Sequence, residues 1–136
     1  MKIWLCPLKP RSWRITRQVR IFGVPKFVRR VFKKVRPGDL LVFHVLKPIN
    51  GIVAVCKVTS PMFEDHQDIW GKNRYPLRVR IEILHERNGN INKPVPLSIL
   101  FGKANNSEIE IEPYLGNVWI TKITETQYKN LEQCFT

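Results

Sequence analysis

The chain has 136 residues, 43% hydrophobic and 25% charged, a composition that favours one folded domain and argues against a disordered chain. No apolar run is long enough to span a bilayer. Residues 1–48 hold 13 of the 23 Lys and Arg residues but one of the 11 acids, so the net charge of +12 is concentrated near the start. Such a one-sided cationic surface is typical of proteins that bind a polyanion, usually nucleic acid.

The first predicted elements are a strand and a short helical segment. Residues 2–6 alternate and are rich in strand-forming side chains, and Pro7 and Pro10 are expected to end this strand. The start of the sequence has no secretory signal pattern, so we expect a soluble, cytoplasmic protein. Residues 11–17 are mainly polar around Trp13, which predicts a short helix or turn.

Residues 20–26 combine an aromatic side chain, a glycine and a proline between cationic residues. Gly23 lets a backbone approach a ligand closely because it has no Cβ atom, and Pro25 stiffens the loop. An aromatic ring beside such a backbone forms a good wall for a flat ligand, a role that Phe22 can fill. The alternative is a Gly-Pro turn with Phe22 in the core, and the local sequence by itself favours that alternative.

Residues 27–35 have the spacing of an amphipathic helix, and a turn follows them. The core-facing side is expected to hold Phe27, Val28, Val31, Phe32 and Val35, and the solvent face Arg29, Arg30, Lys33 and Lys34. Pro37 and Gly38 suit the two central positions of a type II turn, which requires a positive φ at Gly38.

The rest of the chain reads mainly as strands separated by turns. Strands are expected at residues 40–46, 52–59, 75–84 and 117–123, with turns at 50–51 and 88–90, a polar loop over 60–70 and short broken segments over 91–112. A capping box at residues 124–127 predicts a C-terminal helix with Tyr128, Leu131 and Phe135 on one face. Antiparallel strands with short helices predict an α+β fold, either a small barrel or a strongly bent sheet.

No pattern in the sequence indicates catalysis, a cofactor or a metal ion. Cys6, Cys56 and Cys134 lie far apart without metal-ligand spacing, so buried free thiols are expected. His44 and His85 fall in strand patterns, where a core or edge role is the default. The acids around His66 could hold a cation, but their spacing matches no ligand set.

Several short motifs, in order along nearly the whole chain, resemble the EVE domain family. They are Trp4-Leu5-Cys6, Trp13, Phe22-Gly23-Val24-Pro25, residues 35–39, Ser60, Asp65, residues 75–79, Gly116 and residues 123–128. The resemblance implies one domain over residues 1–136 with a PUA-like fold, a bent antiparallel β-barrel of about five or six strands flanked by short helices, related to the YTH domain. It also implies a non-enzymatic reader of DNA or RNA, in which one flipped and often modified base enters a pocket between aromatic walls.

The resemblance also assigns roles to individual residues. Phe22 stands where the family usually has the Trp of one pocket wall, with Gly23 at the close-approach position. The opposite wall is expected from the loop after Ser60, from either Trp70 or Phe63. The implied base pocket comprises Lys9, Ser12, Trp13, Phe22, Gly23, Val24, Pro25, Phe63 and Trp70. The cationic residues implied to bind phosphates are Arg11, Arg14, Arg17, Arg20, Lys26, Arg29 and Arg30.

Some assignments stay open at this point. Lys9 and Ser12 stand where the family often has Asn, so at position 9 a pure donor replaces an amide that both donates and accepts. Trp13 matches a family aromatic residue, but helical packing explains it equally well. The alternative function is an interaction or structural subunit whose basic face holds an acidic partner, or a nucleic-acid backbone without base recognition. An open pocket lined by Phe22 and one indole would support base recognition, and a pocket closed by side chains would support the alternative.

Overall fold

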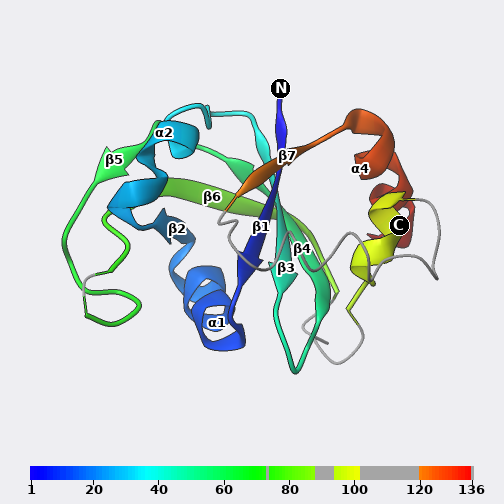
Figure 1. Ribbon diagram of the computed structural model, residues 1–136, viewed down its shortest axis with the longest axis horizontal. Coiled ribbons are helices and arrows are strands. Elements are labelled where there is room, and N and C mark those ends of the chain that lie inside the picture. Colours follow the sequence, from blue (N-terminus) through cyan, green and yellow to red (C-terminus); the bar gives the residue numbers. More distant parts are fainter. Residues whose placement is uncertain (73, 88–93, 102–119, 136) are drawn as a thin grey trace.

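A computed structural model describes residues 1–72, 74–87, 94–101 and 120–135, and its main feature is one curled sheet (Figure 1). The strands are β1 (Ile3–Leu8), β2 (Ile21–Val24), β3 (Leu40–Val45), β4 (Gly51–Val58), β5 (Phe63–Glu64), β6 (Leu77–Glu86) and β7 (Thr121–Ile123). Their order is β2-β6-β4-β3-β1-β7, and β5 pairs with the start of β6 on the edge opposite β2. The bent, sheet-dominated α+β fold expected from the sequence is confirmed.

The sheet is mixed, because β1 runs parallel to β3 while the other strand pairs are antiparallel. Parallel neighbours need a long crossover connection. Here residues 9–39 provide it, and they contain α1 (Pro10–Val19), β2, the 3₁₀ turn η1 (Lys26–Val28) and α2 (Arg29–Phe32). The crossover therefore brings most of the cationic residues of the first third of the chain to one side of the sheet (Figure 1).

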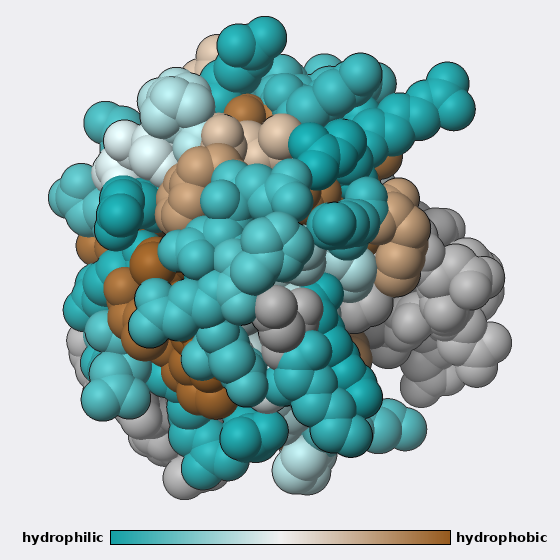
Figure 2. All heavy atoms as spheres, turned by 90° about the vertical axis from the view of Figure 1, so that its left-hand side faces the viewer, coloured by the Kyte–Doolittle hydropathy of each residue, from teal (hydrophilic) through white to brown (hydrophobic). Residues whose placement is uncertain are grey.

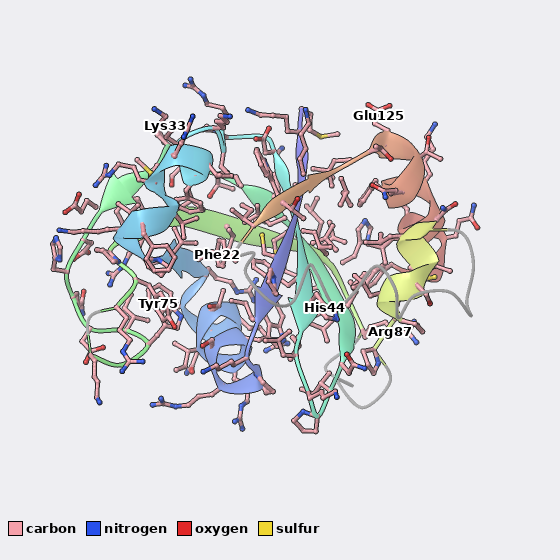
Figure 3. The ribbon with its side chains drawn as sticks, in the orientation of Figure 1. Phe22, Lys33, His44, Tyr75, Arg87 and Glu125 are labelled. Atoms are coloured by element: carbon pink, nitrogen blue, oxygen red, sulfur yellow. The ribbon has the colours of Figure 1, made fainter. Side chains whose placement is uncertain are left out.

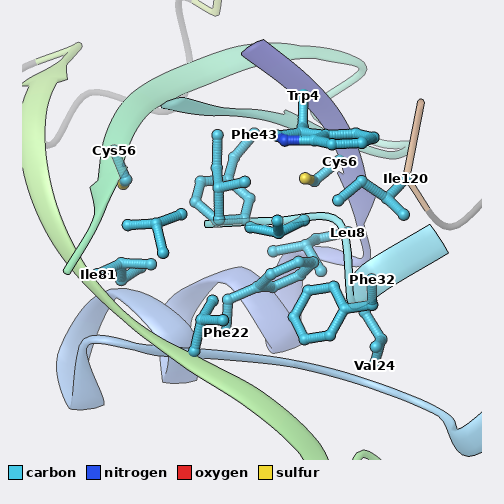
Figure 4. Packing of buried hydrophobic residues seen from close by; sticks show 14 of the residues in the cluster. Trp4, Cys6, Leu8, Phe22, Val24, Phe32, Phe43, Cys56, Ile81 and Ile120 are labelled. Atoms are coloured by element: carbon cyan, nitrogen blue, oxygen red, sulfur yellow. The ribbon is translucent and has the colours of Figure 1, made fainter. Parts of the chain in front are cut away.

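The strands β1 and β3 are buried on both faces, and this explains their continuous apolar runs. Along β1, Trp4 and Cys6 belong to one hydrophobic cluster and Ile3 and Leu5 to the other. The first cluster is closed by α1 and α2 (Figure 4), and the second by η2 (Leu97–Phe101) and by α4 (Glu125–Glu132), which the 3₁₀ turn η3 (Gln133–Phe135) follows.

Two local expectations at the ends of the chain have different outcomes. The strand β1 does not stop at Pro7 but continues to Leu8. The capping box is confirmed: the Thr124 hydroxyl accepts a hydrogen bond from the Gln127 N–H at 3.1 Å, and the Gln127 side chain accepts one from the Thr124 N–H at 2.9 Å. The predicted turn at residues 88–90 and the first three residues of the predicted strand at 117–123 lie outside the described residues, and the end of that strand is β7.

The segment expected to be one amphipathic helix over 27–35 is shorter and differently oriented. It consists of η1 and α2, and Val28, Phe32 and Val35 are buried. Phe27 is 75% exposed and Val31 36% exposed, so their expected core positions are wrong. A 3₁₀ turn advances three residues per turn instead of 3.6, which rotates the first residues away from the face that an unbroken α-helix would bury.

Of the two turns predicted around β3, the one at residues 36–39 is confirmed, whereas the one predicted at 50–51 lies earlier, because Gly51 already belongs to β4. The Asp39 N–H donates to the Arg36 carbonyl at 3.0 Å, and Gly38 has a φ of 95°, as a type II turn requires. The antiparallel hairpin of β3 and β4 is closed by residues 46–50, where Asn50 has a φ of 54°. Within the described residues, no helix is long and apolar enough to cross a bilayer.

Candidate functional site

Phe22 lies in the core and not at the mouth of a pocket. Its ring is 1% exposed and meets the rings of Phe32 and Phe43 edge-on, with centroids 5.8 and 5.2 Å away (Figures 3 and 4). The burial contradicts the partly exposed ring expected of a pocket wall and agrees with the core alternative. Side chains alternate along a strand, so Phe22 and Val24 point into the core while Gly23 faces the other side of β2.

Gly23 allows a close approach, and the group that approaches is the indole of Trp70. A Cβ atom at position 23 would lie 2.7 Å from two atoms of the indole's six-membered ring and 3.0 Å from the Cβ atom of Tyr75. Such distances are shorter than any normal contact, so a side chain at position 23 would displace the ring. The sequence proposed Trp70 or Phe63 opposite this backbone, and the structure places Trp70 there.

Three groups hold the Trp70 indole in this slot. Its Nε1–H donates to the Thr16 hydroxyl at 3.0 Å, the Tyr75 ring meets it edge-on with centroids 5.7 Å apart, and the Arg78 guanidinium lies 5.1 Å from its centroid. Trp70 is 7% exposed, so the chain's own side chain closes the space beside Gly23. This cluster of Thr16, Gly23, Trp70, Tyr75 and Arg78 is called the indole slot below.

Arg78 supplies a buried cation to the indole slot. It pairs across the sheet with Gly23 on β2 and with Phe63 on β5, and these three residues share one face. Its Nε donates to the Tyr75 carbonyl at 3.0 Å and its Nη2 to the Gln67 carbonyl, while Nη1 lies 3.6 Å from an Asp65 carboxylate oxygen. The guanidinium therefore ties the loop over residues 65–75 to the sheet.

Arg78 is 1% exposed, which is rare for an arginine side chain. Nη1 has no hydrogen-bond partner among the described residues. Thr16, Tyr75 and Arg78 were all missed as members of a site. Tyr75 and Arg78 belong to the motif at residues 75–79 that resembles the family, but the sequence of this motif does not indicate which segment covers these side chains.

The other predicted pocket residues take different positions. Trp13 is 1% exposed and its ring centroid lies 5.2 Å from that of Phe43, so it is a core residue of α1. Phe63 is half-buried, with the Arg80 guanidinium 5.4 Å from its ring centroid. Lys9 is the exposed N-cap of α1, and Ser12 is half-buried in its first turn. Pro25 is the half-buried N-cap of η1.

The seven predicted phosphate-binding residues fall into two groups. The first group is exposed and forms no ion pair with another described residue; its members are Arg11, Arg14, Arg20 and Arg30. The second group pairs with carboxylates: Arg17 with Glu86, and Lys26 and Arg29 with Glu64.

The two carboxylates have different surroundings. Arg17 makes a two-point contact with Glu86 at 2.8 and 2.9 Å, which joins α1 to β6, and this hydrogen bonding holds the pKa of Glu86 below its ordinary value. Glu64 accepts from His66 and from Arg29, both at 2.8 Å, and these two bonds hold the pKa of Glu64 down. Lys26 approaches Glu64 to 3.8 Å.

Arg11, a member of the first group, lies near the indole slot. The Arg11 guanidinium comes within 3.8 Å of the position that a Cβ atom of Gly71 would take, next to Trp70. The same helix, α1, carries Arg14 on its exposed side and Thr16 on its buried side. The slot is therefore bordered by one cation, Arg11, that forms no ion pair with another described residue.

Groups that could do covalent or metal chemistry are buried or scattered. Cys6 and Cys56 are buried free thiols whose pKa is raised by burial, and Cys134 is a half-buried free thiol. Burial lowers the pKa of His44 to about 4, so this side chain is neutral at pH 7. Across the described part of the chain, no three His, Cys, Asp or Glu residues are grouped closely enough to hold a metal ion.

Comparison with known proteins gives a family and a fold. The sequence model of the EVE domain matches residues 2–134. A UPF0310 protein of Pyrococcus horikoshii is 30% identical over 98% of this chain and 98% of its own length. A UPF0310 protein of Pyrococcus abyssi is 32% identical over 60% of this chain, and the match spans 65% of that relative.

Solved structures with low sequence identity share the fold. Rpa0253 of Rhodopseudomonas palustris has a TM-score of 0.68 at 13% identity, covering 99% of this chain and 93% of its own. The YTH domain of mmi1, in a structure described as an RNA complex, has a TM-score of 0.65 at 10% identity, covering 98% of this chain and 80% of its own.

Proposed function

The chain belongs to the EVE domain family, and from this membership we propose that it is a non-enzymatic module that binds nucleic acid, DNA or RNA. The observation that carries the proposal is a group of exposed cations on α1, at its C-terminal end and on α2, namely Arg11, Arg14, Arg20 and Arg30, which form no ion pair with another described residue. Cations left without internal partners are available for phosphates. The shared fold with a YTH domain that is described as an RNA complex supports the same function.

Phosphate binding by these cations makes a testable prediction about salt. Affinity for a single-stranded oligonucleotide should fall with salt at a slope of about −0.7 per phosphate contacted, because each contact releases counterions. Arg14→Gln and Arg30→Gln should each reduce the slope by about 0.7. Lys122→Gln is the matched control, since Lys122 is exposed on β7 and away from the slot, and it should leave the slope unchanged.

The measurement is a fluorescence anisotropy titration at four or more salt concentrations, with RNA and DNA strands of the same sequence. An affinity that does not depend on salt, or equal slopes for all three variants and the wild type, would overturn the phosphate contacts. Failure of the wild type to bind any strand, single or double, would overturn the proposed function itself.

Base recognition is the finer part of the proposal, and the indole slot sets its geometry. A base that enters beside Gly23 must part the Trp70 ring from the backbone it now covers, and Trp70 then stacks on the base as the outer wall. The Thr16 hydroxyl, released from the indole, and the Arg78 guanidinium face the entering base as hydrogen-bonding groups. Phe22 supports the strand from the core side and makes no direct contact with the base.

The closed slot favours the second candidate, a module that binds a nucleic-acid backbone or an acidic partner without taking a base. Trp70→Ala separates the two. If a base enters the slot, the variant should lose about five- to 150-fold in affinity for a normal strand, the equivalent of one stacked base, and nothing for an abasic strand of equal length. Equal affinity of the variant and the wild type for both strands would leave backbone binding as the function.

Gly23→Ala is the companion variant for this test. Its methyl group would lie 2.7 Å from the indole, so it should block the close approach of a base to the backbone at position 23. The variant removes neither the Trp70 side chain nor any cation. Isothermal titration at fixed salt measures both variants, and thermal melting checks that each remains folded.

A further inference from the structure

The outer face of η1 and α2 presents apolar and cationic residues together. Phe27 lies in η1, Arg30 and Val31 lie in α2, and Lys34 follows α2, and all four are exposed. Phe27 is 75% exposed, Val31 is 36% exposed, and the two cations are also exposed. This set is called the outer stripe below.

The core fixes the direction of the outer stripe. Val28 and Phe32 are buried at 7% and 0% exposure on the opposite side, and the Phe32 ring meets Phe22 in the first hydrophobic cluster. Rotating Phe27 inward would expose these two side chains. The exposure of Phe27 is therefore imposed by the fold.

The electrostatic surroundings of the outer stripe are positive. Lys26 and Arg29 share one carboxylate, Glu64, with His66. Arg30, Lys33 and Lys34 form no ion pair with another described residue, and Lys33 projects outward from α2 in Figure 3. Figure 2 shows that apolar groups interrupt an otherwise hydrophilic surface on this side of the molecule.

We propose that Phe27 is a stacking platform for a base of single-stranded nucleic acid, with Arg30 and Lys34 on the flanking phosphates. This inference rests on the proposed function and adds a second base-binding position to it. Base stacking on aromatic rings tolerates any sequence because every base has a π face, and cations along the backbone complete such sites.

The outer stripe is connected to the indole slot through β5. Arg29 binds Glu64, the next residue along β5 is Phe63, and Phe63 pairs with Arg78 beneath Trp70. A single strand of nucleic acid can therefore extend from the indole slot to Phe27 over a surface that carries Arg29 and Arg80. The small apolar area favours a nucleic acid over an anionic membrane, because a membrane-binding face needs a wider apolar area than Phe27 and Val31 provide.

The test compares Phe27→Ala with the wild type on a fluorescein-labelled single-stranded oligonucleotide and on an abasic strand of equal length, at one salt concentration. We expect a loss of about five- to 150-fold on the normal strand and no change on the abasic strand. The salt slope should stay constant because no cation is removed, and Phe27→Trp should restore the affinity. Leu84→Ala is the matched control, since Leu84 is another exposed apolar residue, at 40% exposure on β6.

Thermal melting of Phe27→Ala should match that of the wild type, because truncating an exposed ring leaves no cavity. Equal affinity of Phe27→Ala and the wild type for the normal strand, or an equal loss on both strands, would overturn the platform. If Arg14→Gln weakens binding and Phe27→Ala does not, the proposed nucleic-acid binding is supported and the role of Phe27 as a stacking platform is overturned. If the wild type binds anionic vesicles or an acidic peptide but no oligonucleotide, both fall.

Discussion

Phe22→Ala is expected to lower the free energy of unfolding by about 3–5 kcal/mol, the usual cost of truncating a buried aromatic ring. The ring is 1% exposed and packs edge-on against Phe32 and Phe43, so its removal leaves a cavity where three elements meet. A total stability of about 5–15 kcal/mol means that this one change could largely unfold the domain. Chemical denaturation followed by Trp fluorescence measures the effect.

The matched control for this prediction is Phe27→Ala, which removes the same ring from an exposed position on η1 and should change stability by less than about 0.5 kcal/mol. Phe22→Trp should cost about 1–3 kcal/mol through overpacking. A Phe22→Ala variant as stable as the wild type, with weakened oligonucleotide binding, would show that the ring is a pocket wall after all. Affinity is measured on the folded fraction, so that lost stability is not mistaken for lost contacts.

Asp39→Ala is expected to lower the free energy of unfolding by a similar amount, on the order of 3–5 kcal/mol, through lost hydrogen bonds. The carboxylate is in a residue that is 3% exposed, and it accepts from three donors: the backbone N–H groups of Lys2 and Arg36, both at 3.0 Å, and the Trp4 indole N–H at 3.1 Å. Removing it leaves these donors in or near the core without an acceptor.

A pH profile gives Asp39 an independent signature. Burial opposes ionisation, but the three hydrogen bonds outweigh it and lower the pKa of Asp39 below its ordinary value. The ionised carboxylate therefore stabilises the fold at pH values above its unfolded pKa of about 4, and this contribution is lost as the pH falls through the lower folded value. The difference between the denaturant midpoints of the wild type and Asp39→Ala should shrink as the pH is lowered. Glu82 is an exposed acid on β6, and Glu82→Ala is the control, whose denaturant midpoint should change with pH as that of the wild type does.

The sequence predicts those features whose cause lies within a few residues. Gly38 has the positive φ that its turn needs, and the Thr124 cap forms because both partners of the box are three positions apart. The strands β3, β4 and β6 follow from apolar patterning, and the ordered motifs identify the family. Each of these features depends on local geometry or on a sequence pattern, and neither changes with the arrangement of distant elements.

The site was less predictable because it depends on contacts between distant segments. Alternation correctly puts Arg78 opposite Leu77 and Val79, but a loop from residues 65–75 then covers the arginine and supplies two carbonyl acceptors. Phe22 lies beside the Gly23 backbone as expected, yet strand alternation sends its ring to the other side. Phe27 was placed in the core because the spacing did not reveal that its segment starts as a 3₁₀ turn.

The position of β1 between β3 and β7 also has a consequence for self-association. The short strand β7 covers the backbone of Ile3, Trp4 and Leu5, a run that would otherwise be an apolar sheet edge open to pairing with a second copy. The remaining part of β1, which β7 does not pair with among the described residues, contains Pro7, which has no N–H to offer an incoming strand. The strand β7 and Pro7 thus both hinder the pairing of this edge of β1 with a second copy of the chain.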